Sequence, residues 1–263
     1  MIKALVAIEV DLASSFAIRY ACQLSGLIDM EIHPVYVKFP NPEAPMTGVG
    51  WVRHTWEREV VETGREEIQE MLASESESCP VLKEPRVVYG DREQELLRIM
   101  QHEKFGLYIE GAPYPFTPAA IYQRLRGKFY QTLPCPLIWL RGMRKIAKVL
   151  ALCSEPAGAG AVLKSLESLW EGCPTPVHLA YPDAPGGNPD MAAAVAEAGA
   201  RLKAKRCRVI IEEPFAPGAG GLPANMAQDF GLAILALKRG AKKDDPQFQW
   251  LARQRVPLML LLA

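Results

Sequence analysis

One pattern of residues occurs twice in this chain of 263 residues, and it constrains the fold more than any other feature. The segment FGLYI at 105–109 returns as FGLAI at 230–234. Each copy leads, about one helix later, to a proline followed by an apolar run, at 136–140 and at 257–261. A repeat of this length indicates a duplicated structural unit, and half of the chain is the usual size of one hydrophobic core. The sequence therefore predicts two equivalent domains.

The openings of the two copies correspond as well. KALVAIE at 3–9 matches KVLALCS at 148–154, and a short basic linker stands between the copies at 141–145. We therefore expect one domain over residues 1–143 and a second, diverged domain over residues 144–263.

Within each copy, short apolar runs alternate with helical patterns. Continuous apolar runs are typical of strands that are covered on both faces, as in a parallel sheet. The expected strands are 4–8, 32–37, 86–89, 107–110, 137–140, 149–153, 176–180, 208–211, 231–237 and 258–262. The clearest expected helices are 51–75, 119–133, 158–170, 190–205 and 247–253. Because parallel strands need right-handed helical crossovers, the pattern predicts an α/β fold with two tandem, doubly wound, five-stranded parallel sheets.

Segments rich in glycine and proline interrupt this pattern. Residues 39–50 and 214–223 are expected to be loops. The run Gly218-Ala219-Gly220-Gly221 precedes no Lys-Ser or Lys-Thr pair, so a flexible loop is favoured there over a phosphate-binding loop.

Charge and composition exclude several classes of function. The chain has 30 Lys and Arg against 30 Asp and Glu, which argues against a nucleic-acid partner or an anionic membrane partner. The first residues gain acidic side chains after a few apolar positions, so we expect neither a signal peptide nor a membrane span. These observations predict a cytoplasmic protein.

The cysteines and histidines show no pattern of a metal site or a catalytic site. No C-x-x-C pair occurs, and the four histidines form no cluster in the sequence. The cysteines are therefore expected to be free, mostly buried thiols, and they are Cys22, Cys79, Cys135, Cys153, Cys173 and Cys207. No serine or cysteine stands near a histidine in a spacing typical of nucleophilic catalysis. We expect no metal, no catalytic residue and no enzymatic activity.

Four segments of the first copy, taken in order, resemble the universal stress protein family. They are the opening strand and helix at 3–18, the strand and turn VVYGD at 87–91, the strand LYIEG at 107–111, and Pro-Cys-Pro at 134–136. Glu9 stands where the family carries an acidic residue, usually aspartate. The resemblance implies Rossmann-like, adenine nucleotide alpha hydrolase-like domains in a stress-associated binding or regulatory protein. The second copy keeps only the first strand, the fourth strand and the terminal proline.

The resemblance also supplies a test for ATP binding. Family members that bind ATP carry two glycines three residues apart and, further on, a glycine followed by Ser or Thr, which let backbone amides approach phosphate. This chain keeps Gly111, but Tyr114 replaces the second glycine and Gln123-Arg124 replaces the last pair. Prolines that remove backbone donors stand in the same segment at Pro113, Pro115 and Pro118. We therefore expect no cofactor and no ATP binding of the usual kind.

The alternative is an adenine-nucleotide switch that uses a remnant site in the first domain. Open parallel sheets place ligands beyond the carboxyl ends of their strands. The residues of such a site would be Ala7, Glu9, Val37, Gly111, Arg124 and Gly127, with Arg126 and Lys128 as further cations. A solvated basic helix face is the simpler interpretation of these cations. In the second copy, residues 236–243 offer cations but no glycine pair.

The last strand of each copy predicts how the two copies meet. Both strands are strongly apolar, and relatives pair through this strand. Covering each free edge with the other would remove an aggregation-prone surface. We expect an internal pseudo-dimer, leave open a homodimer of two chains, and expect an unknown protein partner.

Overall fold

The computed structural model describes residues 1–38, 51–76, 78–112, 114–183, 189–216, 223 and 225–263. The expected loop at 39–50, the Gly218–Gly221 run and Pro113 lie outside the described residues. Below, residues 1–143 are called the first half and residues 144–263 the second half.

The elements of each half alternate between strand and helix. The first half contains β1 (Ile2–Ile8), α1 (Leu12–Ser25), β2 (Met30–Lys38), α2 (Trp51–Ser76), β3 (Arg86–Tyr89), α3 (Arg92–His102), β4 (Leu107–Gly111), α4 (Pro118–Leu125), α5 (Lys128–Thr132) and β5 (Leu137–Leu140). The second half contains β6 (Val149–Leu152), α6 (Pro156–Leu169), β7 (Val177–Ala180), α7 (Pro189–Ala204), β8 (Val209–Ile211), β9 (Leu232–Leu237), α8 (Pro246–Arg253) and β10 (Leu258–Leu262). Every expected apolar run forms a strand, and every expected strand end is correct within two residues.

The prediction of a single helix over residues 119–133 is wrong, because two helices occupy this segment. α4 ends at Leu125, and α5 begins after Gly127. Gly127 has an extended ψ of 145°, so the chain leaves the helical path there. Glycine is a weak helix former, so the chain can leave the helix here, and the new direction lets Phe129 and Tyr130 of α5 pack in the core.

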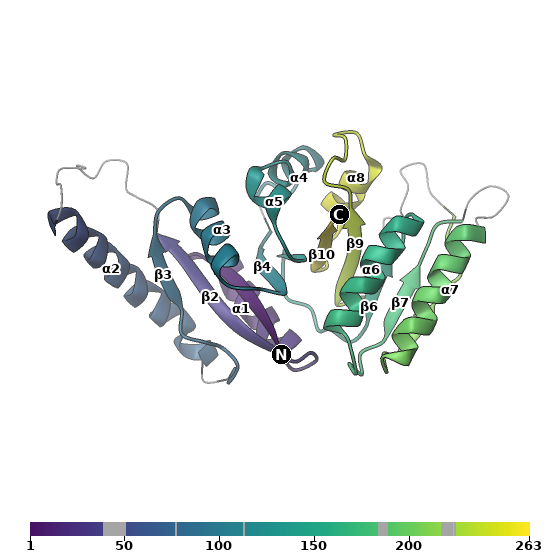
Figure 1. Cartoon of the computed structure of the whole chain (residues 1–263), viewed down its shortest axis with the longest axis horizontal. Helices are drawn as coiled ribbons and strands as arrows, with labels where there is room; N and C mark the ends of the chain where they lie inside the picture. The colour runs from purple at the N-terminus through teal and green to yellow at the C-terminus, as the bar shows by residue number, and fades with distance from the viewer. Residues whose placement is uncertain (39–50, 77, 113, 184–188, 217–222, 224) are drawn as a thin grey trace.

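All ten strands belong to one sheet with the order β3-β2-β1-β4-β5-β10-β9-β6-β7-β8. Pairing within each half is parallel, and the two halves have the same strand order when each is read from its outer edge inward. β5 and β10 pair antiparallel, with Ile138 opposite Met259. Figure 1 shows the first half, from purple to teal, beside the second half, from green to yellow. The α/β fold class is confirmed, and the two five-stranded units form one continuous sheet.

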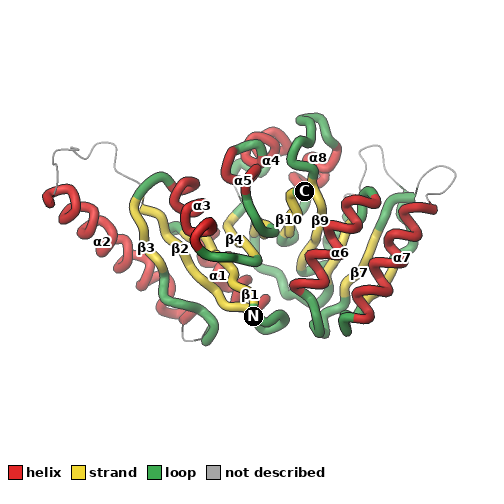
Figure 2. Tube along the Cα trace, viewed as in Figure 1, coloured by secondary structure: helices red, strands yellow, loops and turns green. Residues whose placement is uncertain are grey.

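A hydrophobic core lies on each face of this sheet and runs through both halves. Buried side chains of α1, α2, α6 and α7 form one core, and those of α3, α4, α5 and α8 form the other. Figure 2 shows these helices in red around the yellow strands. Successive residues of β1 alternate between the cores, with Val6 in the first and Leu5 and Ala7 in the second. This is the expected behaviour of a strand that is buried on both faces.

The repeated Phe-Gly pair has a packing role in both halves. Gly106 N–H donates to Lys3 O (2.9 Å), and Gly231 N–H donates to Lys148 O (3.0 Å), so each glycine meets the start of the neighbouring first strand. A Cβ atom on Gly106 would lie 2.7 Å from Ile2 Cγ2, and one on Gly231 would collide with the backbone of Lys145. Only a residue without a side chain fits at either position.

Polar contacts also join the halves around the β5–β10 pair. Arg141 Nη1 donates to Gln254 O (2.6 Å), at the end of α8. From the other core, the buried Tyr20 hydroxyl donates to Gly231 O (3.0 Å). The halves are therefore connected on both faces of the sheet. Among the described residues, no helix is long and apolar enough to cross a lipid bilayer.

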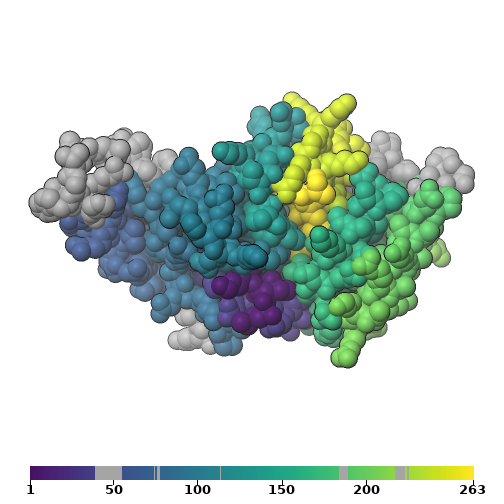
Figure 3. Space-filling model, in the orientation of Figure 1, coloured from purple at the N-terminus to yellow at the C-terminus, as the bar shows by residue number. Residues whose placement is uncertain are grey.

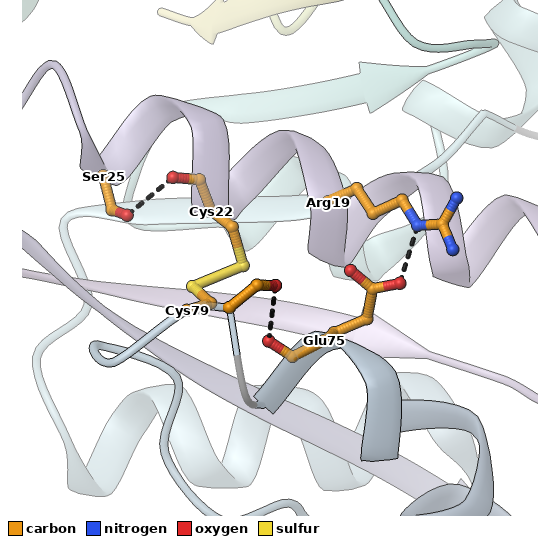
Figure 4. Close-up of a disulfide and its surroundings, with 6 residues drawn as sticks. Arg19, Cys22, Ser25, Glu75 and Cys79 are labelled. Atoms are coloured by element: carbon orange, nitrogen blue, oxygen red, sulfur yellow. Dashed lines mark hydrogen bonds and ion pairs between the residues drawn. A yellow bond between two sulfur atoms is a disulfide. The ribbon is translucent and has the colours of Figure 1, made fainter.

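The expectation of free thiols is wrong for one pair of cysteines. Cys22 on α1 and Cys79, just after α2, form a disulfide with a Cα–Cα distance of 5.8 Å (Figure 4). Arg19 Nε and Glu75 Oε1, 2.6 Å apart, form an ion pair beside it. The 57-residue separation hid the pair, because the packing of α1 and α2 on one face of the sheet brings the two residues together. The other four cysteines are free and buried.

We predict that reduction of the Cys22–Cys79 disulfide lowers the free energy of unfolding by about 2–4 kcal/mol, because the bond restricts a long loop of the unfolded chain. Denaturant titration with and without dithiothreitol measures the loss. The Cys22→Ser/Cys79→Ser protein is the control, and its stability should not respond to the reductant. Six alkylatable thiols in the denatured, unreduced protein, instead of four, would show that the bond is absent.

Candidate functional site

The candidate site lies at the carboxyl ends of the neighbouring strands β1 and β4. From β1 the chain adds β2 and β3 on one side of the sheet, and it then adds β4 and β5 on the other side, so the strand order reverses between β1 and β4. Ligands of open α/β sheets bind at such switch points. Ala7 is in register with Val35 of β2 on one side and with Glu110 of β4 on the other. Glu9 and Gly111 follow at the ends of β1 and β4.

A buried carboxylate occupies the centre of this region. The side chain of Glu110 is 1% exposed. Its Oε1 accepts hydrogen bonds from Tyr130 Oη (2.6 Å) and Trp139 Nε1 (2.8 Å). Its Oε2 accepts from Tyr108 Oη (2.8 Å) and Arg92 Nη2 (3.0 Å). Four donors from four different elements or connections therefore converge on one carboxyl group.

Two arginines balance the charge of the site. Arg92 bridges Glu110 to Glu9, whose Oε1 lies 3.2 Å from Arg92 Nε. Arg124 Nη2 lies 3.5 Å from Glu110 Oε2, and Arg124 Nε donates to Tyr130 Oη (2.6 Å). Two carboxylates thus face two guanidinium groups, and the cluster has no net charge. We call Arg92, Tyr108, Glu110, Arg124, Tyr130 and Trp139 the Glu110 network.

The electrostatics of the network favour the ionised carboxylate. Burial of Glu110 opposes ionisation and by itself would raise the pKa. The positive charges of Arg92 and Arg124, with the hydrogen bonds from Tyr130 and Trp139, outweigh burial and hold the pKa of Glu110 below its ordinary value. Burial, followed by the charge of Glu110, raises the pKa of Tyr130, so this hydroxyl stays protonated and remains a donor.

The second half builds the same fold without this network. At the matching positions its side chains are apolar and fully buried: Ala233, Leu235 and Leu260 stand where the first half has Tyr108, Glu110 and Trp139. Apolar replacement of a buried ion pair is often neutral or stabilising. The fold therefore does not require the Glu110 network, which is a specific property of the first half.

Gly111 makes close contact with α1. A Cβ atom on Gly111 would lie only 2.6 Å from the Cβ of Ala13. In the second half the small residues are exchanged, because Gly158 takes the place of Ala13 and Ala236 takes the place of Gly111. A Cβ atom on Gly158 would lie 3.5 Å from the Cβ of Ala236, which is an ordinary contact. Gly111 thus has a packing role that is independent of any phosphate.

The structure brings together only part of the predicted remnant site. Glu9 and Gly111 lie at adjacent strand ends beside Ala7, and Arg124 joins them through Glu110. The side chains of Ala7 and Val37 belong to the core, with 3% and 8% of each residue exposed. Gly127 lies apart from the strand ends and opens α5.

Sequence reasoning missed most of the Glu110 network. Arg92, Tyr108, Tyr130 and Trp139 come from separate elements or their connections, and no local spacing links them. One signal was available, because Glu110 interrupts an apolar run that the pattern placed in a buried strand. A buried carboxylate needs partners, so that residue could have been identified as the centre of a polar cluster.

The structure also bears on a metal site and on a reactive cysteine. Among the residues that the structure describes, no group of three or more His, Cys, Asp or Glu side chains could hold a metal ion. Burial raises the pKa of the Cys135 thiol to about 12, which makes the residue a poor nucleophile at neutral pH.

The strand order and the antiparallel central pair define two tandem, doubly wound α/β units that share one sheet. The chain is similar in structure to a universal stress protein from Archaeoglobus fulgidus, with a TM-score of 0.64 and 12% identity over 99% of this chain and 96% of that one. A putative universal stress protein from Pseudomonas aeruginosa gives a TM-score of 0.56 and 15% identity, over 99% and 92% of the two chains. No protein-family model and no curated protein matches the sequence. At these identities the comparison establishes the tandem universal stress protein fold.

We predict that Glu110→Gln lowers the free energy of unfolding at pH 7 by about 3 kcal/mol, because it removes the buried carboxylate that faces the partly buried guanidinium groups of Arg92 and Arg124 and leaves Arg92 with Glu9 alone. A lowered pKa in the folded state means that the stabilisation by Glu110 is present above the unfolded pKa of about 4.3 and is lost as the pH falls below it. The difference between wild type and variant should therefore shrink between about pH 5 and pH 3. Denaturant titrations across this range measure it, with the exposed Glu66→Gln as the control. A difference that does not change with pH would contradict the assignment.

We predict that Gly111→Ala destabilises the protein by about 1–3 kcal/mol, since the new methyl group overlaps Ala13. Adding Ala13→Gly, which reproduces the arrangement of the second half, should restore part of this loss. A double-mutant cycle from urea titrations measures the coupling, expected at about 1 kcal/mol or more. Gly158→Ala is the matched control and should cost little, because its site has room. Strictly additive effects would show that the two residues do not share one space.

Proposed function

We propose that this protein is a non-enzymatic, stress-associated binding or regulatory protein of the universal stress type that does not hold ATP in the usual way. The observation that carries the proposal is the Glu110 network. Its arginines, which could otherwise have paired with a phosphate, already face the carboxylates of Glu110 and Glu9. The site at the switch point is therefore neutral and internally satisfied.

The backbone near the strand end also supports this proposal. A phosphate-binding loop needs free amides at the start of the following helix. α4 begins with Pro118, which has no N–H, and Thr117 Oγ1 accepts the hydrogen bond of Ala120 N (3.2 Å). Ala13 occupies the position that a Cβ atom of Gly111 would need, so this glycine is accounted for by packing. These features support the proposal that the phosphates of a nucleotide are not held here.

One observation favours the alternative, an adenine-nucleotide switch in the first half. The side chain of Glu9 is 56% exposed at the end of β1, so an acidic group is accessible beside Ala7. This arrangement could accept a hydrogen bond from an adenine base, although it supplies nothing for the phosphates. Under the leading proposal the chain instead acts through a protein partner, either alone or as a homodimer.

Calorimetric titration of ATP into the full chain, with and without magnesium, tests the proposal. We expect no saturable binding at micromolar ATP and no release of phosphate above the buffer rate. Gly111→Val is unsuitable as a probe because of the contact with Ala13, whereas Glu9→Ala changes a half-exposed side chain. Micromolar ATP binding that Glu9→Ala abolishes, and that inorganic pyrophosphate does not displace, would establish the nucleotide switch in place of our proposal.

A further inference from the structure

A cavity between the two halves collects positive side chains from both of them. Its volume is about 450 Å³, within the usual range for small-molecule sites. Arg126 and Gln131 of the first half line it, together with Arg239 and Lys242 of the second half. We call this cavity the junction pocket. In Figure 3 the teal atoms of the first half lie directly beside the yellow atoms of the second half at the top of the molecule.

Arg239 is a fixed cation in the wall of the junction pocket. Its Nη1 donates to Tyr130 O (3.0 Å) and to Gln131 O, and its Nη2 donates to Leu133 O (2.9 Å). These carbonyl groups lie at the end of α5. An arginine of the second half is thus held in place by the backbone of the first.

Arg126 is positioned by Tyr122 of its own helix, and Tyr122 in turn contacts the second half. Its guanidinium carbon lies 5.5 Å from the centre of the Tyr122 ring, and its Nη1 donates to Tyr122 Oη (3.1 Å). The Tyr122 ring, which also lines the pocket, packs edge-on against Phe248 of α8 at 5.6 Å. The second half therefore supports the tyrosine on which Arg126 rests.

No acidic residue is among the described residues that line the junction pocket. The turn that follows Lys242 carries Asp244, which is exposed and outside the lining, and Asp245, whose carboxylate accepts the hydrogen bond of Gln247 N (2.9 Å) at the start of its own helix. Three cations that share a concavity repel one another, and an anion between them would relieve this repulsion. The arginines of the Glu110 network, in contrast, already have their carboxylates.

We propose that the junction pocket binds a phosphate-bearing small molecule through Arg126, Arg239 and Lys242. Guanidinium groups bind phosphate oxygens with paired hydrogen bonds, and lysine adds a flexible point charge. The cavity is larger than a single phosphate needs, so a compact phosphorylated compound fits its size and charge. The site requires both halves and makes no use of the Glu110 network or of a nucleotide at the switch point.

Titration calorimetry with inorganic pyrophosphate as the probe, at constant ionic strength, tests this proposal. We expect saturable binding to the full chain that weakens about fivefold or more in Arg126→Gln and in Lys242→Gln. Lys128→Gln and Lys243→Gln are matched controls, because they remove the same charge from neighbouring exposed positions outside the pocket, and they should weaken binding less than about twofold.

Three outcomes would overturn the proposal. The first is the absence of saturable binding at millimolar pyrophosphate. The second is equal weakening in the pocket variants and the control variants, which would indicate general attraction to a basic surface. The third is equally tight binding of sulfate at the same ionic strength, which would show that the pocket does not select a phosphorylated ligand. None of these results depends on ATP, so failure here and failure of the proposed function are distinguishable.

Discussion

The antiparallel pairing of β5 with β10 is the interaction on which the rest of the structure depends. Each strand would otherwise be a fully apolar edge, and an exposed apolar edge invites aggregation. Pairing them converts two five-stranded sheets into one sheet with a continuous core on each face. The junction pocket, the Arg239 contacts and the packing of Tyr122 on Phe248 all exist because this pair fixes how the halves meet.

The duplication provides an internal comparison for every feature of the site. Gly106 and Gly231 donate to equivalent carbonyl groups and are both too crowded for a Cβ atom, so this repeated residue belongs to the fold. Glu110 has no such counterpart, because Leu235 occupies the equivalent position in an apolar core. A buried carboxylate with two arginines is costly to assemble, and the second half forms the same strand order without it. The two halves are therefore equivalent scaffolds with different centres.

This difference gives the two proposals their separate physical bases. At the switch point the charges of the first half cancel one another, which leaves no cation for a phosphate. At the junction the cations of both halves accumulate without an acidic neighbour among the described lining residues. The basic segment that follows β4 contributes to both places, because Arg124 faces Glu110 whereas Arg126 lines the junction pocket. Only the fold separates these two arginines.

The sequence by itself determined the number of units, the position of every strand and the class of fold, because apolar runs and glycine positions act over a few residues. It also indicated the loss of the glycine motif, since that motif is local. Only the tertiary structure decided the Glu110 network, the Cys22–Cys79 bond, the break at Gly127 and the junction pocket. The network, the bond and the pocket join residues that are far apart in the chain, and the break reflects how α5 packs its buried Phe129 and Tyr130 on the sheet. Side-chain pairing across such distances depends on how helices pack on the two faces of the sheet, and no local pattern of residues carries that information.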